Sequence, residues 1–158
     1  MKKHLIFFQN LKKKLHNQYA NKQIVLVGGC FDLLHYGHLQ FLKAAKKQGE
    51  ILIVALESDK FIKINKRPNL VHNQKQRKTI LESLKFVDLV ISLPYLFTKN
   101  DYLSLIKTIK PNIIATSKKD PQEKNKRAQA KLVNSKVIIV TPLLKGFSTS
   151  QVLNRLNK

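Results

Sequence analysis

The sequence predicts an α/β fold, in which a five-stranded parallel sheet of the Rossmann-like, doubly wound type carries helices on both faces. Short, continuous apolar runs recur along the chain, and stretches with helical periodicity separate them. Such runs are typical of strands that are buried on both faces of a parallel sheet. The chain has 158 residues, which suits one domain with a sizeable core. Right-handed connections between the strands would then complete the doubly wound arrangement.

The first half of the chain alternates helices and strands in the expected way. A helix over residues 39–47 places Leu39, Leu42 and Ala45 on one face and lysines on the other, and Gly49 is a natural stop for it. In order, the elements predicted here are a basic amphipathic helix over 5–19, strands over 24–27 and 51–56, a short helix or turn over 58–64, a loop over 65–71 and a helix over 74–86.

The second half continues the alternation. A helix over residues 102–109 is expected to stop before Pro111, because proline cannot continue a helix. The remaining predictions are strands over 87–92, 112–115 and 137–140, a polar segment over 121–133 that is either a surface helix or a mobile loop, and a closing helix over 149–156. Residues 1–22 are expected to form an N-terminal basic helix packed on or near the main domain, which spans residues 23–158.

The segment from Gly28 to His38, GGCFDLLHYGH, is the most informative part of the sequence. A strand that ends in two glycines and leads into a helix makes an anion pocket, since glycine lets a ligand approach the backbone and the first helical N–H groups point at it. His35 and His38 lie at that position. They could be polar loop residues, and metal ligation would need a third ligand that the spacing does not supply. Their position favours phosphate chemistry at the carboxyl ends of the strands.

Two further groups of residues are candidates for anion binding. Ser148 and Gln151 have the spacing of a capping box, and the hydroxyl groups around them can form a second phosphate cradle near the end of the fifth strand. Alternatively, they only cap the closing helix. A basic cluster follows the second strand and consists of Lys60, Lys63, Lys66, Arg67 and Arg77. Most such residues are solvated, and Arg77 is the member we expect to reach a phosphate.

Composition restricts the class of protein. The chain carries 30 Lys and Arg against 9 Asp and Glu, a formal net charge of +21, which suggests an anionic partner. The lysines are spread along the whole chain without an arginine-rich stripe, so nucleic-acid binding is the less favoured interpretation. The single cysteine, Cys30, excludes an internal disulfide, and no apolar run has the length of a membrane span or a signal segment. We therefore expect a cytoplasmic protein without a membrane partner.

The motifs resemble those of a known family. Residues 29–38 are similar to the HxGH signature of the cytidylyltransferase-like nucleotidyltransferases, and Gly146-Phe147-Ser148-Thr149-Ser150 resembles their second, serine- and threonine-rich signature. The resemblance covers about residues 24–156 and is strongest to the branch of adenylyltransferase domains in ADP-heptose synthases. After the fourth strand the relatives carry a glycine-rich loop with an aspartate, whereas residues 115–120 contain no glycine and end in Asp120.

The resemblance implies a reaction and a set of site residues. An adenylyl or cytidylyl group would pass from a nucleoside triphosphate, with ATP favoured, to a small phosphorylated acceptor such as heptose 1-phosphate. Mg²⁺ would be held mainly by the nucleotide phosphates, with no protein metal site. The implied catalytic residues are His35, His38 and Arg77; the nucleotide-binding residues are Gly28, Gly29, Cys30, Phe31, Gly37, Gly146, Phe147, Ser148, Thr149 and Ser150; and the substrate-binding residues are Asp32, Lys63 and Arg67.

Several alternatives stay open at this point. The enzyme could be a cytidylyltransferase of the glycerol-3-phosphate type or an FAD-synthase-like enzyme. From another class, a non-catalytic basic protein that binds nucleic acid on the same fold would also account for the charge. The resemblance and the apolar side of residues 5–19 make a homodimer plausible.

Overall fold

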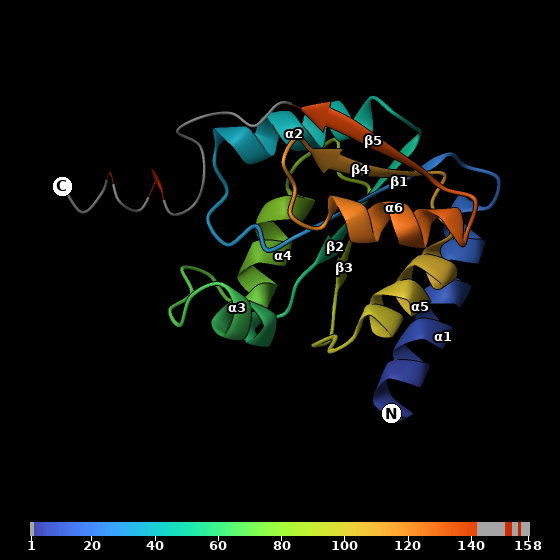
Figure 1. Ribbon diagram of the computed structural model, residues 1–158, viewed down its shortest axis with the longest axis horizontal. Helices are drawn as coiled ribbons and strands as arrows, with labels where there is room; N and C mark the ends of the chain where they lie inside the picture. The colour runs from blue at the N-terminus through green and yellow to red at the C-terminus, as the bar shows by residue number, and fades with distance from the viewer. Residues whose placement is uncertain (1, 142–150, 153–154, 156–158) are drawn as a thin grey trace.

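A computed structural model describes residues 2–141, 151–152 and 155 of the chain. Helices and strands alternate through nearly all of this part (Figure 1). Their bounds are α1 Lys2–Tyr19, β1 Ile24–Gly29, α2 Tyr36–Lys46, β2 Ile51–Leu56, α3 Asp59–Asn65, α4 Gln74–Glu82, β3 Leu89–Ser92, α5 Lys99–Ile109, β4 Ile113–Ser117, α6 Glu123–Lys131 and β5 Lys136–Thr141.

The strands form one five-stranded parallel sheet in the order β3-β2-β1-β4-β5. The chain therefore builds outward from β1 in one direction through β2 and β3, and then crosses to the other side of β1 for β4 and β5. This reversal creates a switch point between β1 and β4. The sheet confirms the predicted Rossmann-like fold class.

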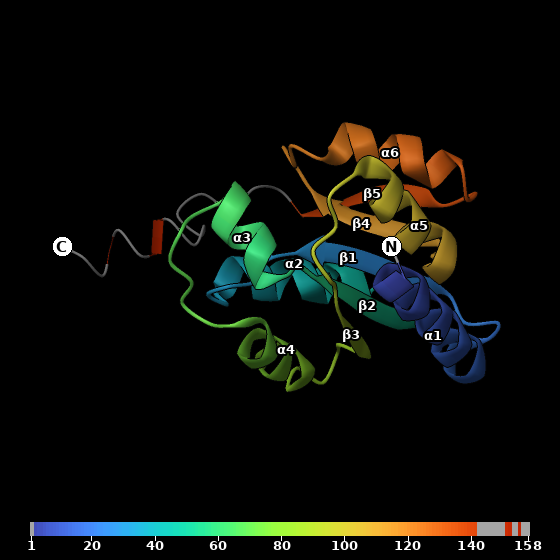
Figure 2. The same cartoon turned by 90° about the horizontal axis from the view of Figure 1, so that it is seen from below.

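The helices cover both faces of the sheet, and each face has its own core. On one face, Leu11 and Leu15 of α1 pack with Ile106 of α5 and Ala130 of α6 in one apolar cluster. On the other face, Leu42 of α2 and Leu81 of α4 belong to a second cluster, together with the alternate residues of the strands. Figure 2 shows α3 and α4 at one side of the molecule and α1 and α5 at the opposite side. Continuous apolar strands are the consequence of this two-sided burial.

Some boundaries differ from the predictions for identifiable reasons. Helix α2 begins at Tyr36 rather than Leu39, because the side chain of His35 caps it. Helix α5 begins at Lys99 rather than at residue 102, because Thr98 and Asp101 form a capping box before the apolar pattern starts. Helix α4 ends at Glu82 rather than at residue 86, and tight turns with hydrogen bonds between residues three apart follow it.

The alternatives left open for residues 121–133 are resolved in favour of a helix, α6. Most of the closing helix predicted over 149–156 lies outside the described residues, although 151–152 and 155 are helical. In the described part of the chain, no helix combines the length and the apolar character needed to cross a membrane.

Candidate active site

The sheet opens at its switch point. Strands β1 and β2 stay paired as far as Gly29 and Leu56, whereas β1 and β4 are paired only at Val25 and Leu26. Beyond Leu26 the two strands no longer form a ladder, so the carboxyl end of β1 has an open side. In doubly wound sheets this is the position where ligands bind.

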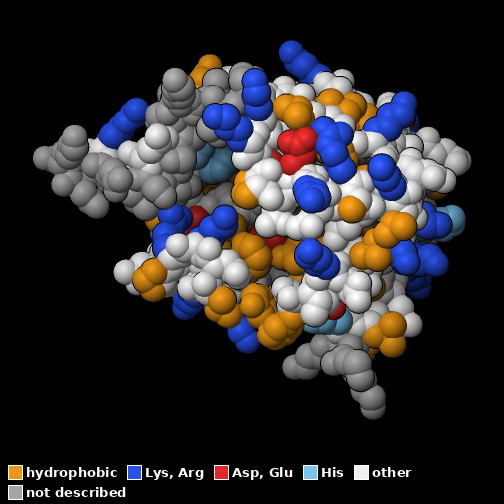
Figure 3. All heavy atoms as spheres, viewed as in Figure 1, with side chains coloured by type: hydrophobic (Ala, Val, Ile, Leu, Met, Phe, Trp, Pro, Cys, Tyr) orange, Lys and Arg blue, Asp and Glu red, His pale blue; other side chains and the backbone are white. Residues whose placement is uncertain are grey.

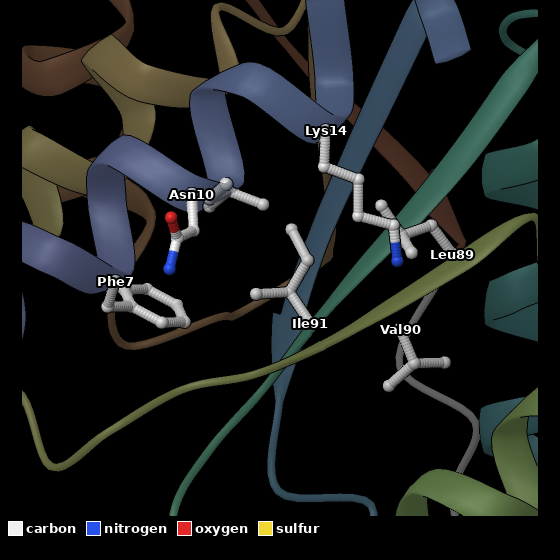
Figure 4. Close-up of a pocket in the computed structure, with 7 residues that line it drawn as sticks. Phe7, Asn10, Lys14, Leu89, Val90 and Ile91 are labelled. Atoms are coloured by element: carbon white, nitrogen blue, oxygen red, sulfur yellow. The ribbon is translucent and has the colours of Figure 1, made fainter. Parts of the chain in front are cut away.

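A cavity of about 880 Å³ occupies this opening. Its wall comes from the ends of β1, β2 and β4, from the segment that leads into α2, and from α3, α5 and α6. A second pocket, of about 230 Å³, lies between α1 and β3 (Figure 4). Lys14 is the only titratable side chain among its lining residues, which offer no constellation for phosphate chemistry. The larger cavity is therefore the candidate site.

The two histidines face this cavity as a stacked pair. Their ring centroids are 3.7 Å apart and their planes differ by 20°. The His35 Nδ1 accepts a hydrogen bond from the backbone N–H of His38 at 3.3 Å, so His35 is the N-terminal cap of α2. The Nδ1 of His38 is buried and has no partner among the described residues. The helix N-terminus and the two rings thus meet at one point of the cavity wall.

Burial keeps both imidazoles neutral. It lowers the pKa of His35 below the ordinary value, and burial together with the neighbouring His35 ring lowers the pKa of His38 to about 4. A neutral imidazole still donates from one ring nitrogen. A bound anion would raise the pKa of both rings, because a negative charge stabilises the imidazolium. The pair is therefore suited to hydrogen bonding with phosphate oxygens.

The residues between the glycines and the histidines are tightly packed. A Cβ atom on Gly29 would lie 2.8 Å from the Phe31 ring, so the ring position requires glycine there. Phe31 has a φ of 46°, and its ring centroid lies 5.1 Å from that of His38. Burial, with Glu57 nearby, raises the pKa of the Cys30 thiol to about 11, so it is protonated at neutral pH and is a poor nucleophile.

Asp32 holds the loop after α3 against the glycine segment. Only 2% of Asp32 is exposed. Its carboxylate accepts hydrogen bonds from the N–H groups of Val71 and His72 and forms an ion pair with Arg67. Burial raises the pKa of Asp32, but these hydrogen bonds and the Arg67 charge outweigh it, and the pKa is lowered overall. Asp32 therefore holds Arg67 in the cavity wall.

The structure does not bring every predicted site residue to the cavity. Arg77 has 0% exposure and is absent from the lining. Its guanidinium donates to the carbonyls of Cys30, Glu57 and His72 and pairs with Asp59 at 2.7 Å, so it binds the ends of β1 and β2 from inside. Lys63 is exposed on α3 and is also absent from the lining.

The other predicted residues of the described chain gather around the cavity. They are Gly28, Gly29, Cys30, Phe31, Asp32, His35, Gly37, His38 and Arg67. The second signature, Gly146 to Ser150, lies outside the described residues. Lys and Arg side chains are scattered over the face shown in Figure 3 and do not form one patch there.

Sequence reasoning missed Glu57 and Tyr102, which line the cavity between β2 and α5. Burial raises the pKa of Glu57 to about 7. The contacts of Asp120 were not predicted from the sequence either. Its carboxylate forms an ion pair with Lys126 at 2.7 Å and accepts a hydrogen bond from the Thr116 hydroxyl at 2.6 Å. The position of Glu57 in the sequence could have identified it as a site residue, because it directly follows β2 at the end of the sheet where the ligand crevice lies.

The doubly wound sheet, the opening beside β1 and the neutral histidine pair at a helix N-terminus define a nucleotide-binding α/β protein. The model of the cytidylyltransferase-like family matches residues 26–155. The chain belongs to this family, and it is a nucleotidyltransferase.

Relatives with longer chains agree with this assignment. The bifunctional protein HldE of Campylobacter jejuni serotype O:2 is 36% identical over 139 residues, which cover 86% of this chain. HldE of Helicobacter pylori strain G27 is 36% identical over 149 residues, or 90% of this chain. The matched parts amount to 28% and 29% of those proteins, so this chain spans less than a third of their length.

Two solved structures are similar in fold. The lipopolysaccharide core biosynthesis protein from Thermoplasma volcanium has a TM-score of 0.62 and 26% identity, and the match covers 79% of this chain and 98% of that one. The pantoate-beta-alanine ligase from Francisella tularensis has a TM-score of 0.66 and 19% identity, with coverage of 94% and 70%. The second likeness concerns the fold alone.

Nucleotidyltransferases of this kind generally use Mg²⁺, and the residues of the cavity fit an ion that the nucleotide brings. No group of three or more His, Cys, Asp or Glu within the described residues has the arrangement of a metal site. Asp32 and Asp120 already engage basic partners. An ion held mainly by phosphate oxygens and water needs few protein ligands.

Proposed function

We propose that the protein transfers an adenylyl group from ATP to a small sugar phosphate such as heptose 1-phosphate and releases pyrophosphate. The observation that carries this proposal is the stacked, neutral pair of His35 and His38 at the N-terminus of α2, in the wall of the cavity at the end of β1. The similarity to HldE proteins and to a lipopolysaccharide core biosynthesis protein supports a sugar phosphate as the acceptor.

In the proposed reaction, an oxygen of the acceptor phosphate attacks the α-phosphorus of ATP. The bond from this phosphorus to the oxygen that bridges to the β-phosphate breaks, and pyrophosphate leaves with the electron pair. Such a step depends on alignment and on neutralisation of charge on the phosphate oxygens. His35 and His38 would donate N–H groups to the α- and β-phosphates at the N-terminus of α2, whose dipole favours a bound anion.

The remaining residues would bind and orient the substrates. The backbone of Gly28 and Gly29 would allow close approach of the nucleotide, and Phe31 would line its pocket. Arg67, held by Asp32, would attract the acceptor phosphate. Residues 146–150 would cradle the β/γ end, as the family resemblance implies. Mg²⁺, when bound, would supply further neutralisation of the phosphate charge.

The test of the histidine pair is the variant His38→Ala. Removal of a preorganised donor should lower kcat by ~10²-fold or more. The assay is pyrophosphate release with ATP and heptose 1-phosphate, and circular dichroism checks that the fold is intact. His16→Ala, on the exposed side of α1, is the matched control and should keep wild-type activity. Unchanged pyrophosphate release by His38→Ala would refute the role of the pair.

The second cradle and the choice of nucleotide need separate measurements. Ser148→Ala should weaken binding of a non-hydrolysable ATP analogue in calorimetry, and equal affinity would count against the cradle. Thermal-shift measurements with ATP, CTP and GTP in the presence of Mg²⁺ compare the donors. A larger stabilisation by CTP would favour a cytidylyltransferase of the glycerol-3-phosphate type instead.

The net charge of +21 is the observation that favours a second candidate, a non-catalytic nucleic-acid-binding protein. A salt titration separates the two functions. Binding to nucleic acid that persists at physiological salt, with a steep log–log dependence on salt concentration, would favour this candidate. Loss of binding at that salt concentration would leave the enzyme as the explanation.

A further inference from the structure

Glu57 occupies a fixed position in the cavity wall. It is the first residue after β2 and has 8% of its surface exposed. Its N–H donates to the carbonyl of Gly29 at 3.0 Å, and its own carbonyl accepts from the Arg77 guanidinium at 2.9 Å. These two contacts fix the backbone of Glu57 at the end of β2, in the wall of the cavity.

The carboxyl group has one occupied and one free oxygen. The Oε1 accepts a hydrogen bond from the Tyr102 hydroxyl of α5 at 2.9 Å. The Oε2 is buried and has no partner among the described residues. A buried acceptor without a donor is costly, and native structures rarely keep one without a reason. A ligand that enters the cavity with a donor group would satisfy it.

The other acids of the cavity wall are engaged by protein groups. Asp32 binds Arg67 and two backbone N–H groups, and Asp120 binds Lys126, Thr116 and the N–H of Gln122. Among the described acidic residues of the lining, Glu57 is thus the one with a buried oxygen left for a ligand.

The surroundings of Glu57 indicate what kind of donor fits. The titratable and charged groups that act on it are Tyr102 from α5, Arg77 from α4, Lys66 after α3 and Cys30 at the end of β1. A carboxylate repels phosphate, so the phosphate of the acceptor belongs nearer to the basic lining residues Lys66, Arg67 and Lys99. A neutral hydroxyl group matches the free oxygen. The combination of an acid, a phenol and nearby cations suits a phosphorylated polyol.

We infer that Glu57 and Tyr102 recognise hydroxyl groups of the acceptor, and that this pair selects sugar phosphates over phosphates that lack hydroxyls. This inference rests on the proposed nucleotidyl transfer, and it assigns recognition of the acceptor to the part of the cavity wall between β2 and α5. A site built to bond a hydroxyl discriminates strongly against an analogue without it, because the polar group of the site is then left unpaired.

The experiment compares heptose 1-phosphate with methyl phosphate, which has no hydroxyl group. Glu57→Gln and Tyr102→Phe keep the size of each side chain, and Glu82→Gln on the exposed side of α4 is the control. The preference is measured as kcat/KM for heptose 1-phosphate divided by kcat/KM for methyl phosphate. This ratio should fall ~10- to 100-fold in Glu57→Gln, mainly through a higher KM for the sugar phosphate. It should fall less in Tyr102→Phe and stay unchanged in Glu82→Gln. The affinity for an ATP analogue should stay within about two-fold in every variant, because the pair is assigned to the acceptor.

The dependence on pH adds a readout that a purely structural role would not move. The carboxylate accepts hydrogen bonds from hydroxyls best when ionised, so KM for the sugar phosphate should rise in the wild type as the pH falls below about 7. Glu57→Gln should show a weaker dependence, because only the phosphate groups of the substrates, whose second pKa is about 6, then titrate in this range. An unchanged acceptor ratio and an unchanged pH profile in both variants would overturn the inference.

Calorimetry separates failure of this inference from failure of the proposed function. Heptose 1-phosphate is titrated into each protein loaded with the ATP analogue. If the wild type binds the sugar phosphate but transfers nothing to it, the proposed reaction fails, and weaker binding in Glu57→Gln still supports the recognition role. Equal binding in Glu57→Gln, Tyr102→Phe and the wild type overturns that role, and so does the absence of binding by the wild type.

Discussion

The buried carboxyl group of Glu57 should make the stability of the protein depend on pH in a way that one substitution removes. Burial raises the pKa of Glu57 from 4.5 to about 7, so the folded protein holds this proton more tightly than the unfolded chain. The resulting stabilisation is fully present below about pH 4.5 and is lost as the pH rises through about 7. The difference in pKa corresponds to about 3 kcal/mol of folding free energy.

Glu57→Gln removes this titration while it keeps the shape of the side chain. Relative to the wild type, the variant should therefore gain about 3 kcal/mol of unfolding free energy between pH 4.5 and pH 8. Urea denaturation followed by circular dichroism at both pH values measures it. The comparison has to be variant against wild type, because neutral His38, with its pKa near 4, contributes stability that is lost as the pH falls from about 6.5 toward 4.

Glu82→Gln, at an exposed glutamate, is the control, and its difference from the wild type should stay within about 0.5 kcal/mol at both pH values. If the difference between Glu57→Gln and the wild type is also the same at pH 4.5 and pH 8, Glu57 is not a buried acid with a raised pKa. The expected dependence of KM on pH would then lose its basis, whereas the free Oε2 rests on the hydrogen-bond geometry.

Two further substitutions test the packing of the site. Asp32→Asn leaves Arg67 without its ionised partner, and this pair is only partly exposed. We therefore expect urea denaturation to show a loss of about 2–4 kcal/mol in unfolding free energy. A loss below about 0.5 kcal/mol would show that Asp32 does not hold the loop after α3. Gly29→Ala places a methyl group against the Phe31 ring, and we expect a cost of about 1–3 kcal/mol together with weaker binding of an ATP analogue in calorimetry. Wild-type stability and affinity in Gly29→Ala would mean that the ring moves aside freely.

The parallel five-stranded sheet was predictable, because apolar runs and helical periodicity mark every strand and nearly every helix. The order of the strands in the sheet was not predicted. The start of α2 was not predicted correctly, since histidine is an uncommon N-terminal cap and Gly37 weakens the helical pattern of the first turn. The start of α5 was missed because Thr98 and Asp101 precede the apolar residues that reveal the periodicity.

Within the site, the glycines and histidines predicted over residues 28–38 lie in the cavity wall, and their types and spacing are what drew attention to them; their roles in binding and catalysis stay predictions. The sequence did not identify Glu57, since a single glutamate after a strand is usually solvated. For Arg77 it predicted contact with phosphate, whereas the side chain is completely buried and donates to backbone carbonyls. Burial and pairing of polar groups depend on which elements meet in space, and a single sequence does not contain that information.

The early end of pairing between β1 and β4 has a consequence for how such a protein can change over evolutionary time. Because β1 and β4 separate after Leu26 while each stays paired with its outer neighbour, the hollow lies between two strands that the rest of the sheet still holds in place. Side chains that border the gap can be exchanged one at a time while the scaffold keeps its shape. Descendants of one ancestral fold can thus acquire new acceptors through local replacements and need not evolve a new architecture.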